Sequence, residues 1–318
     1  MPDYNSKNIR YPSQLAIFLG LTGGGLVIAS LASFAIWTMM TGEPFPLKAE
    51  DILQPKYYTV NMVLQAVSTF LMFFVPVHFF AAICYRKPLT YLGFNFRFTF
   101  KQVLLLTGIL ILTFPLSGAL GELNKYIPIS AYWAAKFKAW ELARQAEEAA
   151  LININSFSRY ILSLFVIAFC PALFEEMFFR GAMQNLFTRW FRGPWAAIIL
   201  TAIIFSIIHL SFYGFLVRFA LGVILGFIFY YSGSLWLSIL FHFLFNGIQV
   251  TALYIMTMNG VKNKNIEESF PLWGGLIALL LLLYLFKMFK QISSAKQSQY
   301  VEEITLDDEF HNWTAKNS

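Results

Sequence analysis

Three ionisable side chains interrupt an apolar stretch in the middle of this chain. The segment "FCPALFEEMFFRGAM", residues 169–183, contains Glu175, Glu176 and Arg180. A charged side chain at the centre of a bilayer costs about 2.5–3.5 kcal/mol on insertion scales, so such residues usually face a protein interior or a water-filled cavity. Glu176 and Arg180 are one helical turn apart and can form an ion pair. Glu175 lies about 100° round the helix and is left for another role.

Two histidines and an asparagine lie in later apolar stretches. "FSIIHLSF" contains His209, and "LFHFLFNG" contains His242 and Asn246, which are spaced to share one helix face. A turn is predicted near Arg192, with Glu175 17 residues before it and His209 17 residues after it. Antiparallel helices with the same rise per residue would bring Glu175 and His209 to the same depth. His242 and Asn246 would have to pack against this pair.

These residue types favour hydrolysis of an amide bond. A buried glutamate can act as a general base on water, and a histidine can orient that water. A second histidine and an asparagine amide can donate hydrogen bonds to a developing oxyanion. Alternatively, Glu175, His209 and His242 could bind zinc, which would then activate the water. The sequence contains neither an H-E-x-x-H motif nor a nucleophile-elbow motif.

The elements that must position these residues are membrane helices. The 318 residues are 58% hydrophobic and only 13% charged, and apolar runs of about 20 residues recur. We predict an all-α, polytopic membrane helix bundle with about eight transmembrane helices, at residues 14–40, 60–85, 102–120, 157–188, 195–211, 213–231, 234–256 and 272–289. Residues 131–152 lack Gly and Pro and place aromatic residues at helical spacing, which indicates an amphipathic helix in the membrane interface. A soluble helix packed on the bundle is the alternative.

The order of the motifs resembles that of a known family. E-E-x-x-x-R from Glu175 to Arg180, F-x-x-x-H from Phe205 to His209, and H-x-x-x-N from His242 to Asn246 follow one another on successive predicted helices. This pattern is similar to that of the CPBP family of CAAX proteases and bacteriocin-processing enzymes, also called the Abi family. It resembles the type II CAAX prenyl endopeptidases within that family.

The resemblance implies a role for each motif residue. Glu175 would activate the water together with His209, and His242 and Asn246 would form the oxyanion hole. Glu176 and Arg180 would support the site. The implied organisation is a set of N-terminal membrane helices with the interfacial helix at residues 1–155, a CPBP-like catalytic core at 156–256, and the last membrane helix with a polar, acidic tail at 257–318.

We expect no cofactor, although members of the family are described both as metalloproteases and as metal-free, glutamate-dependent proteases. An oxyanion role explains Asn246, whereas an amide is a poor zinc ligand. Zinc bound by Glu175, His209 and His242 is the alternative.

The expected partners are membrane lipids and a hydrophobic or lipidated peptide or protein substrate. Nucleic acid is not expected, because the net charge of +6 includes no basic cluster of that kind. We expect a multi-pass protein of the plasma (inner) membrane. Two other functions also fit buried polar groups: a non-catalytic immunity factor or scaffold, and a proton-coupled transporter. The transporter function is disfavoured because the sequence contains no evident repeat.

Overall fold

Helices make up most of the residues that the computed structural model describes, which are 6–46, 49–151, 153–261 and 271–317. The α-helices are α1 (Tyr11–Thr41), α2 (Ala49–Ile52), α3 (Tyr58–Thr69), α4 (Val75–Cys84), α5 (Pro88–Leu92), α6 (Phe100–Lys125), α7 (Ala131–Leu151), α8 (Phe157–Ser163), α9 (Cys170–Glu176), α10 (Asn185–Phe191), α11 (Pro194–Ile207), α12 (Phe215–Ser232), α13 (Leu235–Met258) and α14 (Leu272–Asn317). A 3₁₀ turn, η1 (Pro55–Tyr57), precedes α3, and three π-helical segments continue the longer helices: η2 (Phe70–Phe74), η3 (Leu164–Phe169) and η4 (Met177–Gln184).

Seven helical stretches within the described ranges are long and apolar enough to cross a membrane. They are Tyr11–Thr41, Pro55–Cys84, Phe100–Lys125, Phe157–Phe191, Phe215–Ser232, Leu235–Met258 and Leu272–Ser294. The prediction of an all-α, polytopic membrane bundle is confirmed, and the chain is an integral membrane protein.

The helix predicted at residues 195–211 is shorter than expected. This helix, α11, has 14 residues and ends at Ile207. The N–H of Ile208 still bonds to the carbonyl of Ile204, but those of His209 and Leu210 bond to carbonyls three residues back, which tightens the chain into a turn. Leu210 then adopts a left-handed φ of 50°, which an α-helix cannot continue through. His209 therefore lies in a turn and not on a helix.

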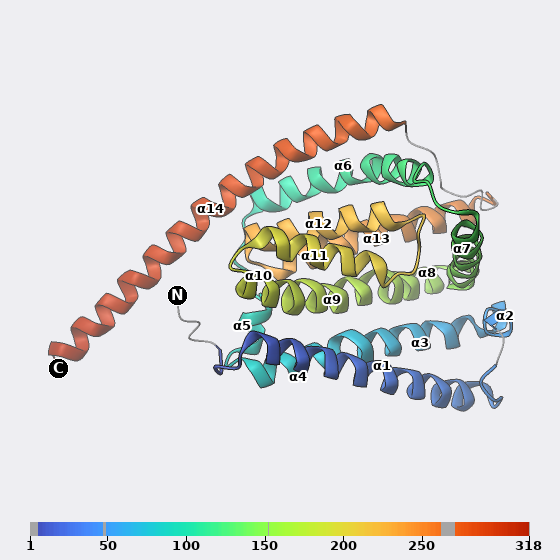
Figure 1. Cartoon of the computed structure of the whole chain (residues 1–318), viewed down its shortest axis with the longest axis horizontal. Coiled ribbons are helices and arrows are strands. Elements are labelled where there is room, and N and C mark those ends of the chain that lie inside the picture. The colour runs from blue at the N-terminus through green and yellow to red at the C-terminus, as the bar shows by residue number, and fades with distance from the viewer. Residues whose placement is uncertain (1–5, 47–48, 152, 262–270, 318) are drawn as a thin grey trace.

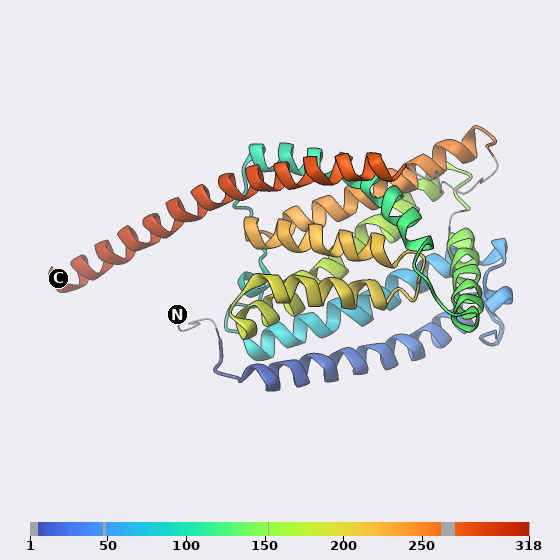
Figure 2. The ribbon, with the colours of Figure 1, turned by 45° about the horizontal axis from the view of Figure 1, so that its top comes forward.

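The helices lie side by side, and the site motifs lie on those in the middle. In Figures 1 and 2, α8 to α13 form the middle of the bundle, α1 packs beside α3 and α4, and α14 packs along α6. Both views place the N- and C-termini towards one end of the bundle, while α7 runs across the opposite end. The chain therefore crosses the bundle an even number of times, and α11 is one of these passages.

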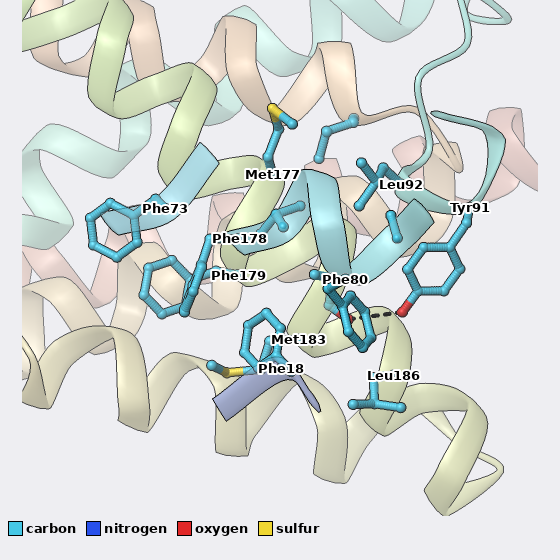
Figure 3. Close-up of a cluster of buried hydrophobic side chains, with 14 of the residues drawn as sticks. Phe18, Phe73, Phe80, Tyr91, Leu92, Met177, Phe178, Phe179, Met183 and Leu186 are labelled. Atoms are coloured by element: carbon cyan, nitrogen blue, oxygen red, sulfur yellow. Dashed lines mark hydrogen bonds between the residues drawn. The ribbon is translucent and has the colours of Figure 1, made fainter. Parts of the chain in front are cut away.

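A cluster of aromatic residues attaches the first helical hairpin to the helix that carries the glutamates. Phe18 of α1 lies with its ring centre 5.2 Å from that of Phe80 and 4.7 Å from that of Phe178. Figure 3 shows these rings together with Tyr91, whose hydroxyl donates to the carbonyl of Ala182 at 3.1 Å. Burial of large aromatic side chains is a major source of packing energy. This cluster therefore fixes one side of the helix formed by α9 and η4, which carries the glutamates and is called the site helix below.

The opposite side of the site helix contacts the backbone of α12 at two glycines, which have no side chain to block the approach. Gly222 and Gly226 are one turn apart on α12. Their carbonyls accept hydrogen bonds from Arg180 at 3.3 Å and from Gln184 at 3.0 Å. A Cβ atom at Gly222 would lie 2.8 Å from the Cβ of Ala202 on α11, so only glycine permits this close approach.

We expect Gly222→Ala to lower stability by about 1–3 kcal/mol, because the added methyl group overpacks the contact with Ala202. A displacement of α12 by the methyl group would also move the Gly222 carbonyl, which accepts a hydrogen bond from Arg180. Thermal unfolding of the purified protein measures the effect. Gly24→Ala is the matched control, because nothing lies within 4 Å of a Cβ atom at Gly24. Equal midpoints for the two variants would contradict the expectation.

Candidate active site

Glu176 and Arg180 form a buried ion pair on the site helix. Both side chains are 0% exposed, and Nη1 of Arg180 lies 2.7 Å from Oε1 of Glu176. The pair therefore forms as the spacing of the two residues predicts. The guanidinium also lies 4.9 Å from the ring centre of Phe205, so it is enclosed by a carboxylate, a backbone carbonyl and an aromatic face. Removal of one partner would leave a charge without its counter-ion inside the bundle.

Glu176 has a second partner that the sequence analysis did not identify. Nδ1 of His242 lies 2.9 Å from Oε1 of Glu176, the same oxygen that accepts from Arg180. An ionised carboxylate can only accept, so the Nδ1–H of His242 donates this bond. The bond fixes the orientation of the imidazole and leaves Nε2 for other contacts. Glu176 thus links the site helix to α13.

His209 is held by its own chain and faces the same region. Its Nδ1 lies 2.7 Å from the carbonyl oxygen of Phe205, and because a carbonyl can only accept, Nδ1 carries the proton. Nε2 of the neutral ring is then a proton acceptor. The ring of Phe205 lies 4.8 Å from that of His209 and 6.4 Å from that of His242. The structure therefore brings the two predicted histidines to one aromatic side chain.

Glu175 differs from Glu176 in both exposure and bonding. Its side chain is half-buried, and within the described part of the chain no other side chain makes a hydrogen bond with it. It interacts electrostatically with His242, Glu176 and Arg180, so it belongs to the same charged group. Asn246 is also half-buried and follows His242 by one turn of α13. Its amide is therefore on the same side of α13 as the imidazole.

The described residues do not form an evident metal centre. Among them, no three His, Cys, Asp or Glu side chains are grouped so that they could share a metal ion. Glu175, His209 and His242, the set considered for zinc, do not form such a group among the described residues.

The turn that carries His209 also contacts α7. Ser211 donates from Oγ to Oε2 of Glu141 at 2.8 Å, and Glu141 pairs with Arg144. The rings of Phe137 and Phe212 stack with their centres 4.6 Å apart. Burial would raise the pKa of Glu141, but hydrogen bonds from Arg144 and Ser211 lower it below its ordinary value. Glu141 is therefore an ionised acceptor at neutral pH, and the sequence analysis did not include it in the site.

One missed feature had a sequence signal. The G-x-x-x-G spacing of Gly222 and Gly226 in an apolar helix is typical of close helix packing and could have identified α12 as a neighbour of the site helix. No such signal marks Glu141 or Ser211, because their contact joins segments that are 70 residues apart.

Comparisons with known proteins agree with the motif pattern. The family model described as type II CAAX prenyl endopeptidase Rce1-like matches residues 157–248. This segment begins at the start of α8, ends within α13, and includes every residue of the candidate site. We found no match to the chain among curated proteins or among solved structures. Residues 157–248 are thus similar to the type II CAAX prenyl endopeptidase Rce1-like family, the resemblance that the order of the motifs predicts.

Proposed function

We propose that this protein is an intramembrane endopeptidase that hydrolyses a peptide bond of a hydrophobic or lipidated peptide or protein. The main support is the contrast between the two adjacent carboxylates. Glu176 binds Arg180 and His242, whereas Glu175 makes no hydrogen bond with another described side chain. One carboxylate thus supports the site while the other is available to bind and deprotonate water.

In the proposed reaction, Glu175 accepts a proton from a water molecule that Nε2 of His209 orients. The water oxygen attacks the carbonyl carbon of the peptide, and the electron pair of the C=O bond moves to its oxygen. The amide of Asn246 and Nε2 of His242, when that nitrogen carries a proton, donate to this oxyanion. The intermediate then collapses, the C–N bond breaks, and the proton held by Glu175 passes to the departing amine.

We propose that this reaction needs no metal ion. An asparagine amide is a poor zinc ligand but a good oxyanion donor, so Asn246 has a role in the metal-free reaction. The carboxylate of Glu176 holds Nδ1 of His242. This bond would orient Nε2 equally well as a hydrogen-bond donor to an oxyanion or as a metal ligand.

The substrate class follows from the environment of the site. The site residues lie on or beside membrane helices, and a member of a CAAX protease family acts on prenylated or membrane-associated proteins. A hydrophobic or lipidated segment could reach these residues from the bilayer. We propose the plasma (inner) membrane as the location.

Comparison of protein termini in matched cells tests the function. Wild type and Glu175→Gln are expressed at equal membrane levels in cells of the source organism that lack the gene, and new N- and C-termini are mapped by mass spectrometry. Termini that occur only with the wild type would support proteolysis and identify the substrate. Glu122→Gln is the control, because Glu122 forms a surface ion pair with Lys125 and no described hydrogen bond joins it to a site residue.

Identical termini for wild type and Glu175→Gln would contradict the proposal if both proteins are folded and a candidate prenylated substrate is co-expressed. Function that survives in Glu175→Gln would instead favour an immunity factor or scaffold. Proton-dependent flux in sealed vesicles, lost in Glu175→Gln, would favour a transporter.

A further inference from the structure

The turn that carries His209 has a strained backbone. Leu210, the next residue, has a φ of 50°, a left-handed conformation that non-glycine residues rarely adopt. Such a residue persists where the surrounding structure holds it in place, and strain of this kind is concentrated at functional sites. The side chain of Leu210 is 67% exposed, so its own packing does not hold the turn.

A fully buried asparagine bonds to the backbone on the far side of this turn. Asn124, in the last turn of α6, is 0% exposed. Its Nδ2 donates to the carbonyl of Phe212 at 2.8 Å, and its Oδ1 accepts from the N–H of Leu216 at 3.0 Å. The Leu216 N–H lies in the first turn of α12, where helical N–H groups lack helical partners. One amide therefore ties the end of the turn to the start of α12.

A second hydrogen bond connects the two ends of the segment that contains the turn. The hydroxyl of Ser206, in the last turn of α11, donates to the carbonyl of Phe215 at 2.7 Å. The chain from Ser206 to Leu216 is thus held by Ser206 on one side and by Asn124 on the other. His209 lies within this segment, and the bond from its Nδ1 to the carbonyl of Phe205 orients the imidazole.

We propose that Asn124 is a positioning residue for His209. The inference rests on the proposed function, because it assigns Asn124 to the alignment of the Nε2 atom that orients the water. Asn124 lies outside the matched segment 157–248, so the N-terminal half of the chain contributes to the site. Loss of the amide would release the turn, and a displacement of about 1 Å in a catalytic group can lower the rate about 100-fold.

Asn124→Leu tests this assignment, because leucine has a similar size and forms neither hydrogen bond. We expect kcat to fall about 100-fold while KM changes less than about twofold. The tautomer of His209 is the second readout, measured by ¹⁵N NMR of histidine-labelled protein in lipid vesicles. The chain has only four histidines, so His209→Gln assigns the signal. We expect the fixed Nδ1–H tautomer of the wild type to be lost in Asn124→Leu.

Asn61→Leu is the matched control. Asn61 is also buried, and its Nδ2 donates to the carbonyl of Ile52 at 2.9 Å in a connection remote from His209. We expect this variant to lose stability but to keep kcat and the His209 signal. A purely structural role for Asn124 would affect both variants alike.

A folded Asn124→Leu with wild-type kcat, or with an unchanged His209 signal, would overturn the assignment. If Asn124→Leu does not fold, Asn124→Asp provides the same test, since aspartate keeps the acceptor for Leu216 and loses the donor to Phe212. A wild-type protein that cleaves nothing would refute the proposed function instead, and the NMR signal would still report on the turn.

Discussion

We expect Glu175→Gln to lower kcat/KM by about 10²–10⁴-fold, the range usually attributed to one general base. Glutamine has nearly the same shape as glutamate but cannot accept the proton from water. Because Glu175 is half-buried and makes no hydrogen bond with another described side chain, the substitution should leave the fold intact. Cleavage of a fluorogenic prenylated peptide by purified protein in vesicles measures the effect.

The same variant should be at least as stable as the wild type. Burial is the largest unfavourable effect on the ionised form of Glu175, and the adjacent Glu176 repels it, whereas His242 and Arg180 attract it. Neutralisation of Glu175 removes this repulsion, so activity and stability change in opposite directions. A loss of both in Glu175→Gln would show that Glu175 has a structural role, and retained cleavage would refute its role as the base.

Arg180→Met should destabilise the protein by about 3–5 kcal/mol, the usual cost when one partner of a buried pair is removed. Glu176 would keep only His242 as a partner, and the cation that offsets its charge would be gone. The carbonyl of Gly222 would also lose its bond from Arg180. Chemical unfolding in micelles measures the loss.

A double variant separates the unpaired charge from the lost packing. In Arg180→Met with Glu176→Gln, no charge is left without a counter-ion, so we expect much of the stability to return. Activity should stay low, because His242 would be oriented by a neutral amide. An equal loss of stability in the single and double variants would contradict this account. Arg180→Lys is not a conservative control, since lysine cannot contact Glu176 and Gly222 with a planar fork.

The fold class and the site helix could be predicted because their signals are local. Runs of apolar residues mark the membrane helices, and the four-residue spacing of Glu176 and Arg180 places them on one face. The turn expected near Arg192 is present: Arg192 ends α10 with a φ of 56° and α11 begins two residues later. The catalytic roles of Glu175, His209, His242 and Asn246 stay predictions.

The contacts between helices could not be predicted from local spacing. Glu176 reaches His242 across 66 residues, and the sequence does not show which side chain another helix presents to it. The end of α11 was also misplaced, because His209, Leu210 and Ser211 follow an apolar run without the Gly or Pro that usually marks a helix end. The left-handed Leu210 that ends the helix is strained, and composition does not reveal strain.

The shortness of α11 bears on the depth in the membrane at which the proposed reaction would take place. Its 14 residues extend about 21 Å, roughly 9 Å less than the hydrocarbon thickness of a typical bilayer. Ile207, Ile208 and Leu210 next to His209 are exposed, and their apolar side chains suit acyl chains better than water. We infer that the turn with His209 lies below the headgroups, so that bilayer thickness would influence the proposed reaction.

We expect kcat/KM to be higher in vesicles of short-chain phosphatidylcholine than in vesicles of long-chain phosphatidylcholine, because a thinner bilayer brings water closer to the turn. An equal rate in both would mean that the protein supplies its own water path. If the dependence is found, the membrane takes part in substrate selection: a protein is cut only where its peptide bond can descend to the level of Glu175.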